Sequence, residues 1–315
     1  MPFVTAFYRA LGTGMVISVD SPIDDKVRSA MESLIEDYEH VLSRFRNDSL
    51  IAAIGKAEHG GSFDFPDWCA PLFDLYDALF SATSGAIDPC VGEDLIRLGY
   101  DASLSFTVTQ DAPEHLGALR GRAVWGRDVP RHGTTLVTHE PVQLDFGACG
   151  KGYLVDLLGR MLQSSQFVID AGGDLLIHAE QPISVALEDP EDQSHAIGIA
   201  HIANGALCAS APSRRHWNVA VNERTQIAIH HLLNAIDGLP AQQTEASWAY
   251  VPANATLNLA RDYPTAVADG LATALFVSDV AQLQRTFDFT YATLDESRQI
   301  AVSRNFPAEL FLRSA

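Results

Sequence analysis

The sequence predicts an α+β protein in which helices pack against mostly antiparallel strands. Three observations support this: two long amphipathic segments near the N-terminus, strand-like stretches joined by short turns in the C-terminal third, and no regular alternation of strand and helix. Regular alternation would indicate a parallel sheet instead. Apolar residues make up 47% of the chain and charged residues 19%, which favours a packed core over disorder.

Two helices are expected early in the chain, at 25–45 and 67–85. Both segments place apolar residues at the spacing of one helical face. In the second, Asp67 is a suitable N-cap and Gly85 a suitable C-terminal stop.

Residues 103–145 contain several turn glycines and are expected to form strands and loops. A short strand at 142–146, a glycine-rich turn and a helix at 151–163 should follow. Because no linker rich in Pro, Gly or Ser divides the chain, we expect one domain over residues 1–315. The remaining expected elements are strands at 167–169, 197–202, 206–210, 225–233, 246–251 and 289–291, and a helix at 264–276.

The net charge is −19, from 40 acidic and 21 basic residues, which disfavours binding to nucleic acids or anionic lipids. None of the four cysteines has metal-type spacing, so free thiols in a reducing compartment are expected. The sequence shows no signal peptide, and no apolar run approaches the ~20 residues that span a bilayer. We therefore expect a cytoplasmic protein with no membrane insertion.

The segment LDFGACGKGYLVD, residues 144–156, is a candidate anion site. Backbone N–H groups at a helix start favour phosphate, and Lys151 adds a full positive charge. The alternative is an ordinary strand-to-helix turn whose glycines serve packing. The DAGGD segment, residues 170–174, follows a strand and allows close approach of another backbone or a ligand, although a tight turn is the more frequent explanation of such a pattern.

The segment AVADGLATALFV, residues 266–277, places Asp269 and Thr273 four residues apart on one helix face. A carboxylate and a hydroxyl side by side suit a hard cation such as Mg²⁺. Because the neighbouring residues are apolar, a buried carboxylate here needs a reason. The alternative is a solvent-facing aspartate near a helix start.

Two further segments carry polar groups at turns. In IAIHHLLNAIDG, residues 227–238, the side chains of His230 and His231 should point to opposite faces of a strand, so one of them can reach a site. Without a third ligand they are weak candidates for zinc. The segment SGAIDPCVGEDLIRLGYD, residues 84–101, contains Asp88 before a proline and indicates a loop.

Together, the identity and order of these segments resemble the ApbE family, the FAD:protein FMN transferases. The resemblance covers nearly the whole chain. LDFGACGKGYLVD is similar to the family's Leu-Asp-Leu-Gly-Gly-Ile-Ala-Lys-Gly-Tyr-x-x-Asp, and ADGLATALFV to its Ala-Asp-x-x-Ala-Thr-Ala helix. The other segments that carry the resemblance are Leu11-Gly12-Thr13, SRFRNDSLIAAI at 43–54, GAIDPCVG at 85–92, DAGGD at 170–174 and HHLLNAIDG at 230–238.

The resemblance implies a T-fold-like α+β architecture that binds FAD and uses Mg²⁺ at the pyrophosphate. Such enzymes transfer FMN to a Thr or Ser hydroxyl of an acceptor protein and release AMP, and some hydrolyse FAD instead. In this sequence it implies metal ligation by Asp269, Thr273 and the carbonyl of Gly150, and catalysis by His231, Asp269 and Lys151. The residues that it implies for cofactor binding are Leu11, Phe45, Asp88, Lys151, Asp156 and His231.

The sequence also departs from the family's pattern. The family's Asp-Pro-x-Thr after the histidine is here Asn234-Ala235-Ile236-Asp237, and a Gly and an aromatic residue are replaced in SAPSRRHW, residues 210–217. Phe45 stands in place of a tyrosine and Asn47 in place of a proline. These changes leave two alternatives to FMN transfer: an FAD pyrophosphatase, and a catalytically inactive FAD-binding protein. Mn²⁺ is an alternative to Mg²⁺, since both prefer oxygen ligands.

Overall fold

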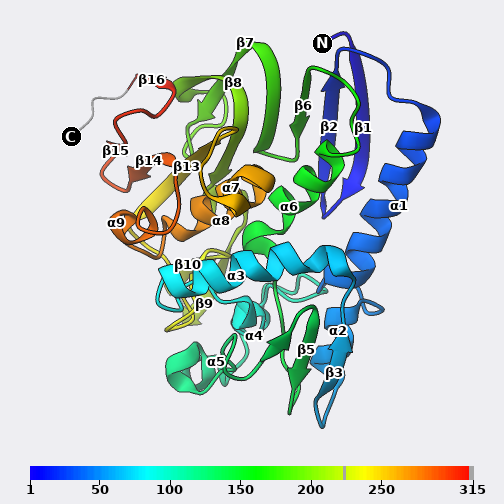
Figure 1. Cartoon of the computed structure of the whole chain (residues 1–315). Coiled ribbons are helices and arrows are strands. Elements are labelled where there is room, and N and C mark those ends of the chain that lie inside the picture. The colour runs from blue at the N-terminus through cyan, green and yellow to red at the C-terminus, as the bar shows by residue number, and fades with distance from the viewer. Residues whose placement is uncertain (223–224, 312–315) are drawn as a thin grey trace.

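A computed structural model describes residues 1–222 and 225–311 of the chain. Over these residues a sheet of nine antiparallel strands forms the centre of the molecule, and the α+β prediction is confirmed. Figure 1 shows α1, α6 and α8 on the same side of this sheet, with α3 lying across their ends. In spatial order the strands are β1 (Phe3–Ala10), β2 (Thr13–Val19), β6 (Phe167–Asp170), β7 (Asp174–Glu188), β8 (Ala196–Ser210), β13 (Thr244–Pro252), β14 (Thr290–Asp295) and β15 (Ile300–Val302), with β16 (Ala308–Leu310) beside β8.

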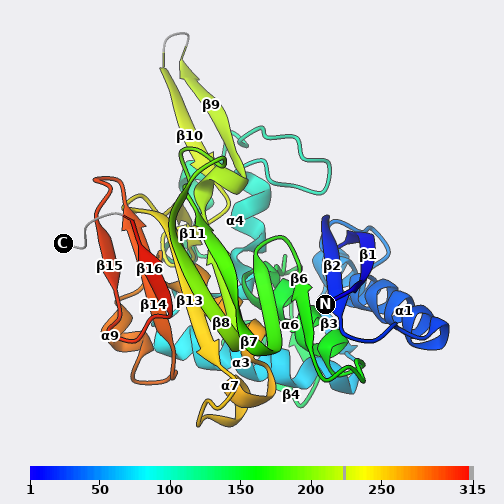
Figure 2. The same cartoon turned by 90° about the horizontal axis from the view of Figure 1, so that it is seen from above.

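Three smaller sheets complete the described strands. They are β3 (Gly61–Asp64), β5 (Thr135–Thr138) and β4 (Arg131–His132) in one sheet, β9 (His216–Asn222) and β10 (Thr225–His230) in a second, and β11 (Leu233–Asn234) and β12 (Leu239–Pro240) in a third. Figure 2 shows β9 and β10 extending beyond the main sheet, next to α4.

The helices cover one face of the main sheet and the region below it. They are α1 (Asp25–Leu42), α2 (Leu50–Lys56), α3 (Ala70–Ala82), α4 (Gly92–Arg97), α5 (Ala112–His115), α6 (Gly147–Gly159), α7 (Asn258–Asp262), α8 (Pro264–Ala274) and α9 (Val280–Leu283). Short 3₁₀ turns stand at Asp67–Cys69, Pro89–Val91, Ala118–Arg120 and Pro212–Arg214. Among the described residues, no helix is both long and apolar enough to cross a membrane.

The main hydrophobic core lies between the sheet and the helices. It consists of buried apolar side chains drawn from the chain between Phe7 and Phe289. Burial of such a contiguous apolar cluster is the main stabilising term in folding. The prediction of one domain over 1–315 stays a prediction. All four cysteines are buried and unpaired.

The helices expected from apolar periodicity are present, with shifted ends. The helix expected at 25–45 ends at Leu42, and that expected at 264–276 ends at Ala274. The expectation that Asp67 caps the second helix is wrong, because Asp67 begins a 3₁₀ turn and α3 starts at Ala70. The strand expected at 142–146 is also absent, and the turn expected after it is the first turn of α6.

The strands of the C-terminal half differ more from expectation. Strand β7 was not expected, because Pro182 interrupts its alternation, and the β7–β8 register shifts between His178 and Ile183. The two strands expected at 197–202 and 206–210 are one continuous strand, β8.

Gly152 permits the close contact between α6 and α8. A Cβ atom at this position would lie 2.3 Å from the Thr265 carbonyl oxygen, which belongs to a rigid backbone. Gly150, two positions earlier in the same helix, has only the Tyr38 hydroxyl at 3.5 Å from such an atom.

We predict that Gly152→Ala lowers the free energy of unfolding by about 1–3 kcal/mol, because the added methyl group forces α6 and α8 apart. Gly150→Ala is the matched control and should be neutral or stabilising by about 1 kcal/mol, since alanine favours the helix. Urea denaturation of the two variants measures both values. Equal changes in the free energy of unfolding for the two variants would show that the contact at Gly152 does not set the distance between α6 and α8.

Candidate functional site

The centre of the candidate site is Lys151, in the first turns of α6. Its Nζ atom lies 2.9 Å from Oδ2 of Asp174 and 3.1 Å from Oδ1 of Asp269. Asp174 begins β7 and Asp269 lies in the middle of α8, so three elements meet at one ammonium group. The two aspartate side chains are 1% and 2% exposed, whereas the Lys151 side chain is 34% exposed and opens the cluster to solvent.

The charges of this cluster do not balance, because two carboxylates share one ammonium. Burial raises the pKa of Asp269 to about 7, and the charge of Asp174 adds to the effect. Burial also raises the pKa of Asp174. Burial disfavours the charged form of Lys151, but the two carboxylates outweigh this effect and raise the pKa of the ammonium group. The cluster therefore has an excess negative charge that a further cation would offset.

The donors expected to hold a metal lie next to this cluster. The amide of Gly152 donates to Oδ2 of Asp269 at 3.0 Å, and Thr273 follows Asp269 by one helical turn and is half-buried. The carbonyl of Gly150 accepts a hydrogen bond from the Tyr38 hydroxyl at 2.8 Å. Because Gly150 lies within α6, its carbonyl also belongs to the hydrogen-bond ladder of the helix, and a metal would have to replace or share one of these partners.

These donors fit a hard cation better than zinc. They are a carboxylate, a hydroxyl and a carbonyl, all oxygen atoms, and Mg²⁺ uses one or two carboxylates and completes its shell with phosphates and water. Neither carboxylate oxygen of Asp174 makes a hydrogen bond of good geometry, so this buried group has unused acceptor capacity. Among the described residues, no cluster of three or more His, Cys, Asp or Glu side chains could hold a metal alone.

Asp156 is buried and caps the first turn of α8. Its carboxylate is 3% exposed and accepts the backbone amides of Thr265, at 3.1 Å, and Ala266, at 2.8 Å. These amides belong to the first turn of α8, where unpaired N–H groups need acceptors. Asp156 therefore fixes the start of the helix that carries Asp269, from a position inside the protein.

His231 lies just after β10 and is partly exposed. Its Nδ1 atom is 3.2 Å from the carbonyl oxygen of Arg215, and its ring packs against the edge of Tyr100, with centroids 6.4 Å apart. Because a carbonyl can only accept, Nδ1 carries the proton and Nε2 has a free lone pair. The other histidine, His230, directs Nε2 at the carbonyl of Ala241, at 2.7 Å.

The imidazole of His231 is neutral at physiological pH. Removal from water by the surrounding protein lowers its pKa to about 4, although the bond to Arg215 opposes this shift. The positive charges of Arg215 and Lys151 lower the pKa further, so both cations lie near this ring.

A cavity of about 410 Å³ opens beside His231. Its walls combine aromatic rings with guanidinium groups and are lined by Tyr100, Leu104, Phe106, Ser213, Arg214, Arg215 and His216. Arg215 bonds to the Tyr100 hydroxyl. Flat aromatic surfaces next to positive charge suit an anionic ligand that carries a ring system.

Phe45 borders this region, whereas Leu11 is held by α1. The Phe45 ring is 41% exposed and lies edge-on to Tyr100, at 5.4 Å between centroids. The guanidinium of Arg44 lies over the Phe45 ring at 4.2 Å. Leu11 has a left-handed backbone, with φ of 53°, and its amide donates to Oε1 of Glu39 at 2.8 Å.

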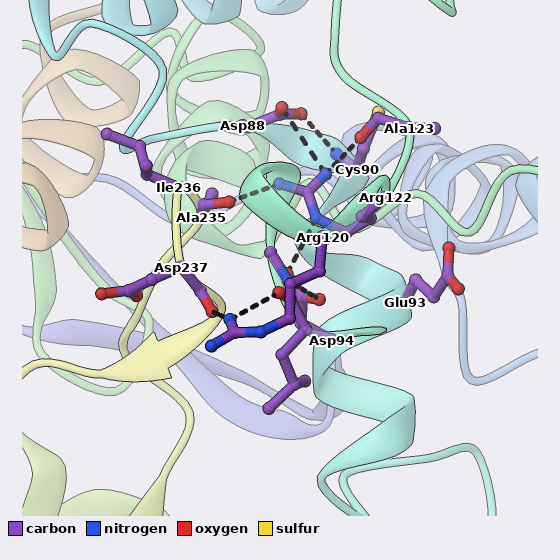
Figure 3. Close-up of polar contacts among 12 residues, drawn as sticks. Asp88, Cys90, Glu93, Asp94, Arg120, Arg122, Ala123, Ala235, Ile236 and Asp237 are labelled. Carbon is purple, nitrogen blue, oxygen red and sulfur yellow. Dashed lines mark hydrogen bonds and ion pairs between the residues drawn. The ribbon is translucent and has the colours of Figure 1, made fainter. Parts of the chain in front are cut away.

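Asp88 lies in a second, fully buried network. It is 3% exposed, accepts the amide of Cys90 at 2.7 Å, and lies 3.6 Å from Nη1 of Arg122 (Figure 3). Of the residues predicted from the sequence, one group lies together on α6 and α8: Gly150, Lys151, Asp269 and Thr273. His231 and Phe45 lie by the cavity. Asp88 and Asp156 are buried inside the protein. The role of each in binding or catalysis stays a prediction.

Sequence reasoning did not select Asp174, Tyr100, Arg215 or Arg122. For Asp174 a signal was present, because DAGGD had been singled out as a place of close approach. Tyr100 lies in segment 84–101 and Arg215 in segment 210–217, but no local pattern marks either side chain as part of a site. Arg122 follows Arg120 by two residues, in a stretch without a recognisable motif.

Fold and site together describe an α+β protein in which oxygen donors surround Lys151 and a cavity with aromatic and guanidinium walls opens beside His231. The sequence profile of the ApbE family matches residues 11–293, and the chain belongs to this family. It is 23% identical over 283 residues to an FAD:protein FMN transferase of Klebsiella pneumoniae (strain 342), covering 83% of this chain and 74% of that protein. It is 27% identical over 286 residues to one of Treponema pallidum (strain Nichols), covering 80% and 72%.

Solved structures show the same fold. The ApbE protein of Thermotoga maritima superposes with a TM-score of 0.79 at 20% identity, covering 98% of this chain and 99% of that one. The flavin transferase ApbE of Vibrio cholerae gives a TM-score of 0.76 at 17% identity, covering 96% and 97%.

We predict that His231 titrates near pH 4 in NMR spectra of the folded protein. An unfolded chain binds this proton near the ordinary pKa of 6.5, so it holds more protons than the folded chain between these values. The folded state should therefore lose stability as pH falls through this window. When the pH falls from about 7 to about 5, the free energy of unfolding should decrease less in His231→Gln than in the unaltered protein. A pKa near 6.5 in the folded protein would contradict this.

Proposed function

We propose that this protein transfers FMN from FAD to a Thr or Ser hydroxyl of an acceptor protein and releases AMP. The observation that carries the proposal is the meeting of Lys151, Asp174 and Asp269 at the first turns of α6. This arrangement offers an ammonium, helix amides and a cation site to a pyrophosphate. The curated relatives are FAD:protein FMN transferases, which agrees with this chemistry.

Asp269, Thr273 and the Gly150 carbonyl would hold Mg²⁺ or Mn²⁺. When bound, the metal would neutralise charge that builds on the pyrophosphate oxygens. Lys151 supplies a second positive charge, and its partial exposure lets it exchange a carboxylate for a phosphate oxygen. Asp156 and Gly152 keep α8 close enough for these groups to act on one ligand.

The reacting hydroxyl belongs to the acceptor protein. Its oxygen attacks the phosphorus of the FMN half, the bond from that phosphorus to the AMP oxygen breaks, and AMP leaves with its electrons. The hydroxyl proton goes to Nε2 of His231, which has a free lone pair because Nδ1 donates to Arg215. The negative charge of bound FAD raises the pKa of this imidazole from about 4 toward a value suited to a general base.

The cavity beside His231 is the place that we assign to a ring system of FAD. Tyr100 and Phe106 offer aromatic faces, and Arg215 offers a positive charge. We also infer that the enzyme acts in the cytoplasm, and cell fractionation would test that location.

The decisive experiment measures AMP release from FAD by the purified protein with Mg²⁺. One tube contains an acceptor peptide with a threonine, one contains the same peptide with valine in its place, and one contains no peptide. AMP that appears only with threonine, together with a gain on the peptide of the mass of FMN less one water, supports transfer. AMP at equal rates in all three tubes indicates a pyrophosphatase, which the altered segment 234–237 would favour. FAD binding without AMP in any tube indicates a binding protein.

We predict that Asp269→Asn lowers AMP release by at least about 100-fold at saturating FAD, because the metal loses its carboxylate ligand. Chelation of Mg²⁺ should have the same effect on the unaltered protein. Asp262→Asn is the control, since Asp262 is an exposed residue at the end of α7 that pairs with Arg261. An Asp269→Asn enzyme with full activity would exclude the proposed metal site.

A further inference from the structure

The segment that carries His231 has little regular structure of its own. Strands β11 and β12 have two residues each and pair only with one another. Between them the chain turns back through hydrogen bonds from the Gly238 amide to the Asn234 carbonyl, 2.7 Å, and from the Ile236 amide to the Asn234 side chain, 3.0 Å. So short a hairpin is marginal in water and needs contacts from elsewhere to keep one position.

Those contacts come from residues 117–122, more than 100 positions earlier in the chain. The amides of Ala118 and Leu119 donate to the carbonyls of Ala235, at 3.2 Å, and Ile236, at 3.0 Å. Arg120 donates from Nη1 to the Asp237 carbonyl at 3.2 Å. The Ala235 amide also donates to the Ala86 carbonyl at 3.1 Å, so the hairpin is fixed through backbone groups, which the side chains of residues 234–237 do not control.

Arg122 is the buried centre of this contact (Figure 3). Its side chain is 0% exposed, and Nη2 donates to the Ala235 carbonyl at 2.7 Å while Nη1 donates to the carbonyl of Ala123. A guanidinium has a fixed planar fork of donors, so these two bonds set its orientation relative to the hairpin.

Two buried carboxylates hold the guanidinium from the other side. Nε of Arg122 lies 2.8 Å from Oδ2 of Asp94, and Nη1 lies 3.6 Å from Oδ2 of Asp88. Asp94 also accepts the amide of Gly117 at 2.8 Å, which ties the network to the start of the 117–122 segment. Burial of three charges with excess negative charge is costly, so the network contributes fixed geometry more than stability.

The backbones of the 117–122 segment and the hairpin also approach each other closely, and this contact involves no charged group. A Cβ atom at Gly117 would lie 2.3 Å from the carbonyl carbon of Asp237, and one at Gly238 would lie 2.5 Å from the amide nitrogen of Gly117. The two segments therefore touch backbone to backbone, and any side chain at either glycine would push the hairpin away.

We propose that Arg122 is a positioning residue that holds the 232–238 hairpin, and with it the imidazole of His231, in the geometry needed for transfer. The inference rests on the proposed function, in which His231 accepts the hydroxyl proton. Arg122 acts through the Ala235 carbonyl, and it does not line the cavity that we assign to FAD. This clamp uses main-chain acceptors, so it operates although residues 234–237 differ from the family's Asp-Pro-x-Thr.

The first test is Arg122→Lys, which keeps the charge but cannot reach both carbonyls and both carboxylates. We expect kcat for FMN transfer to fall about tenfold or more, because small displacements of a catalytic group cost large factors in rate. The Kd for FAD should change by less than about threefold, since Lys151 and Asp269 lie on other elements. Equal loss of kcat and FAD binding would overturn the proposal.

The second test leaves the buried charges in place. Gly117→Ala and Gly126→Ala both introduce alanine at a left-handed φ of 77°, but only the first meets the hairpin, because nothing lies within 4 Å of a Cβ at Gly126. We expect Gly117→Ala to reproduce the kcat loss of Arg122→Lys, and Gly126→Ala to keep kcat within about twofold after correction for folded fraction. Equal kcat for the two glycine variants would overturn the proposal.

A readout that needs no turnover separates this inference from the proposed function. The NMR titration of His231 should move from near pH 4 toward 6.5 in Arg122→Lys and Gly117→Ala, and stay in place in Gly126→Ala. If the unaltered protein releases no AMP, the proposed function fails, and this titration still decides whether Arg122 positions the ring. An unmoved titration in both variants would refute the clamp even in an active enzyme.

Discussion

The site depends on the close crossing of α6 and α8. Gly152 removes the side chain that would keep these helices apart, and Asp156 caps the first turn of α8 from within α6. The same crossing brings the Gly152 amide to the carboxylate of Asp269 and sets Lys151 beside it. A change in helix spacing would alter every distance around Lys151 and Asp269 at once, because packed interiors do not deform gradually.

The crossing has an energetic consequence for the carboxylates that it buries. Asp174 and Asp269 leave water with a single ammonium between them, and both have raised pKa values for this reason. Such an arrangement contributes little to stability compared with apolar packing. It does leave excess negative charge in the interior, which one more positive charge would offset, and this imbalance is the physical reason for proposing a metal at the site.

The sequence predicted what depends on local spacing and missed what depends on distant partners. The helices α1 and α8, and the pairing of Asp269 with Thr273 on one face, follow from periodicity within a few residues. Strand β7 was missed because Pro182 breaks the local pattern at a register shift that only its neighbour β8 explains. Arg122 could not be found in this way, since its partners Asp88 and Ala235 lie 34 and 113 residues away and its own neighbours give no pattern.

The protein contains two clusters in which one basic side chain meets two buried carboxylates, and their difference lies in access. Lys151 is 34% exposed and is a flexible point charge, so it can exchange a protein carboxylate for a ligand phosphate without unfolding its surroundings. Arg122 is 0% exposed, and its rigid fork is divided between carboxylates and main-chain carbonyls. Its guanidinium is closed off from solvent, so its charge acts on the segments that it joins. The same composition of charges therefore gives a binding site where solvent enters and a clamp where it does not.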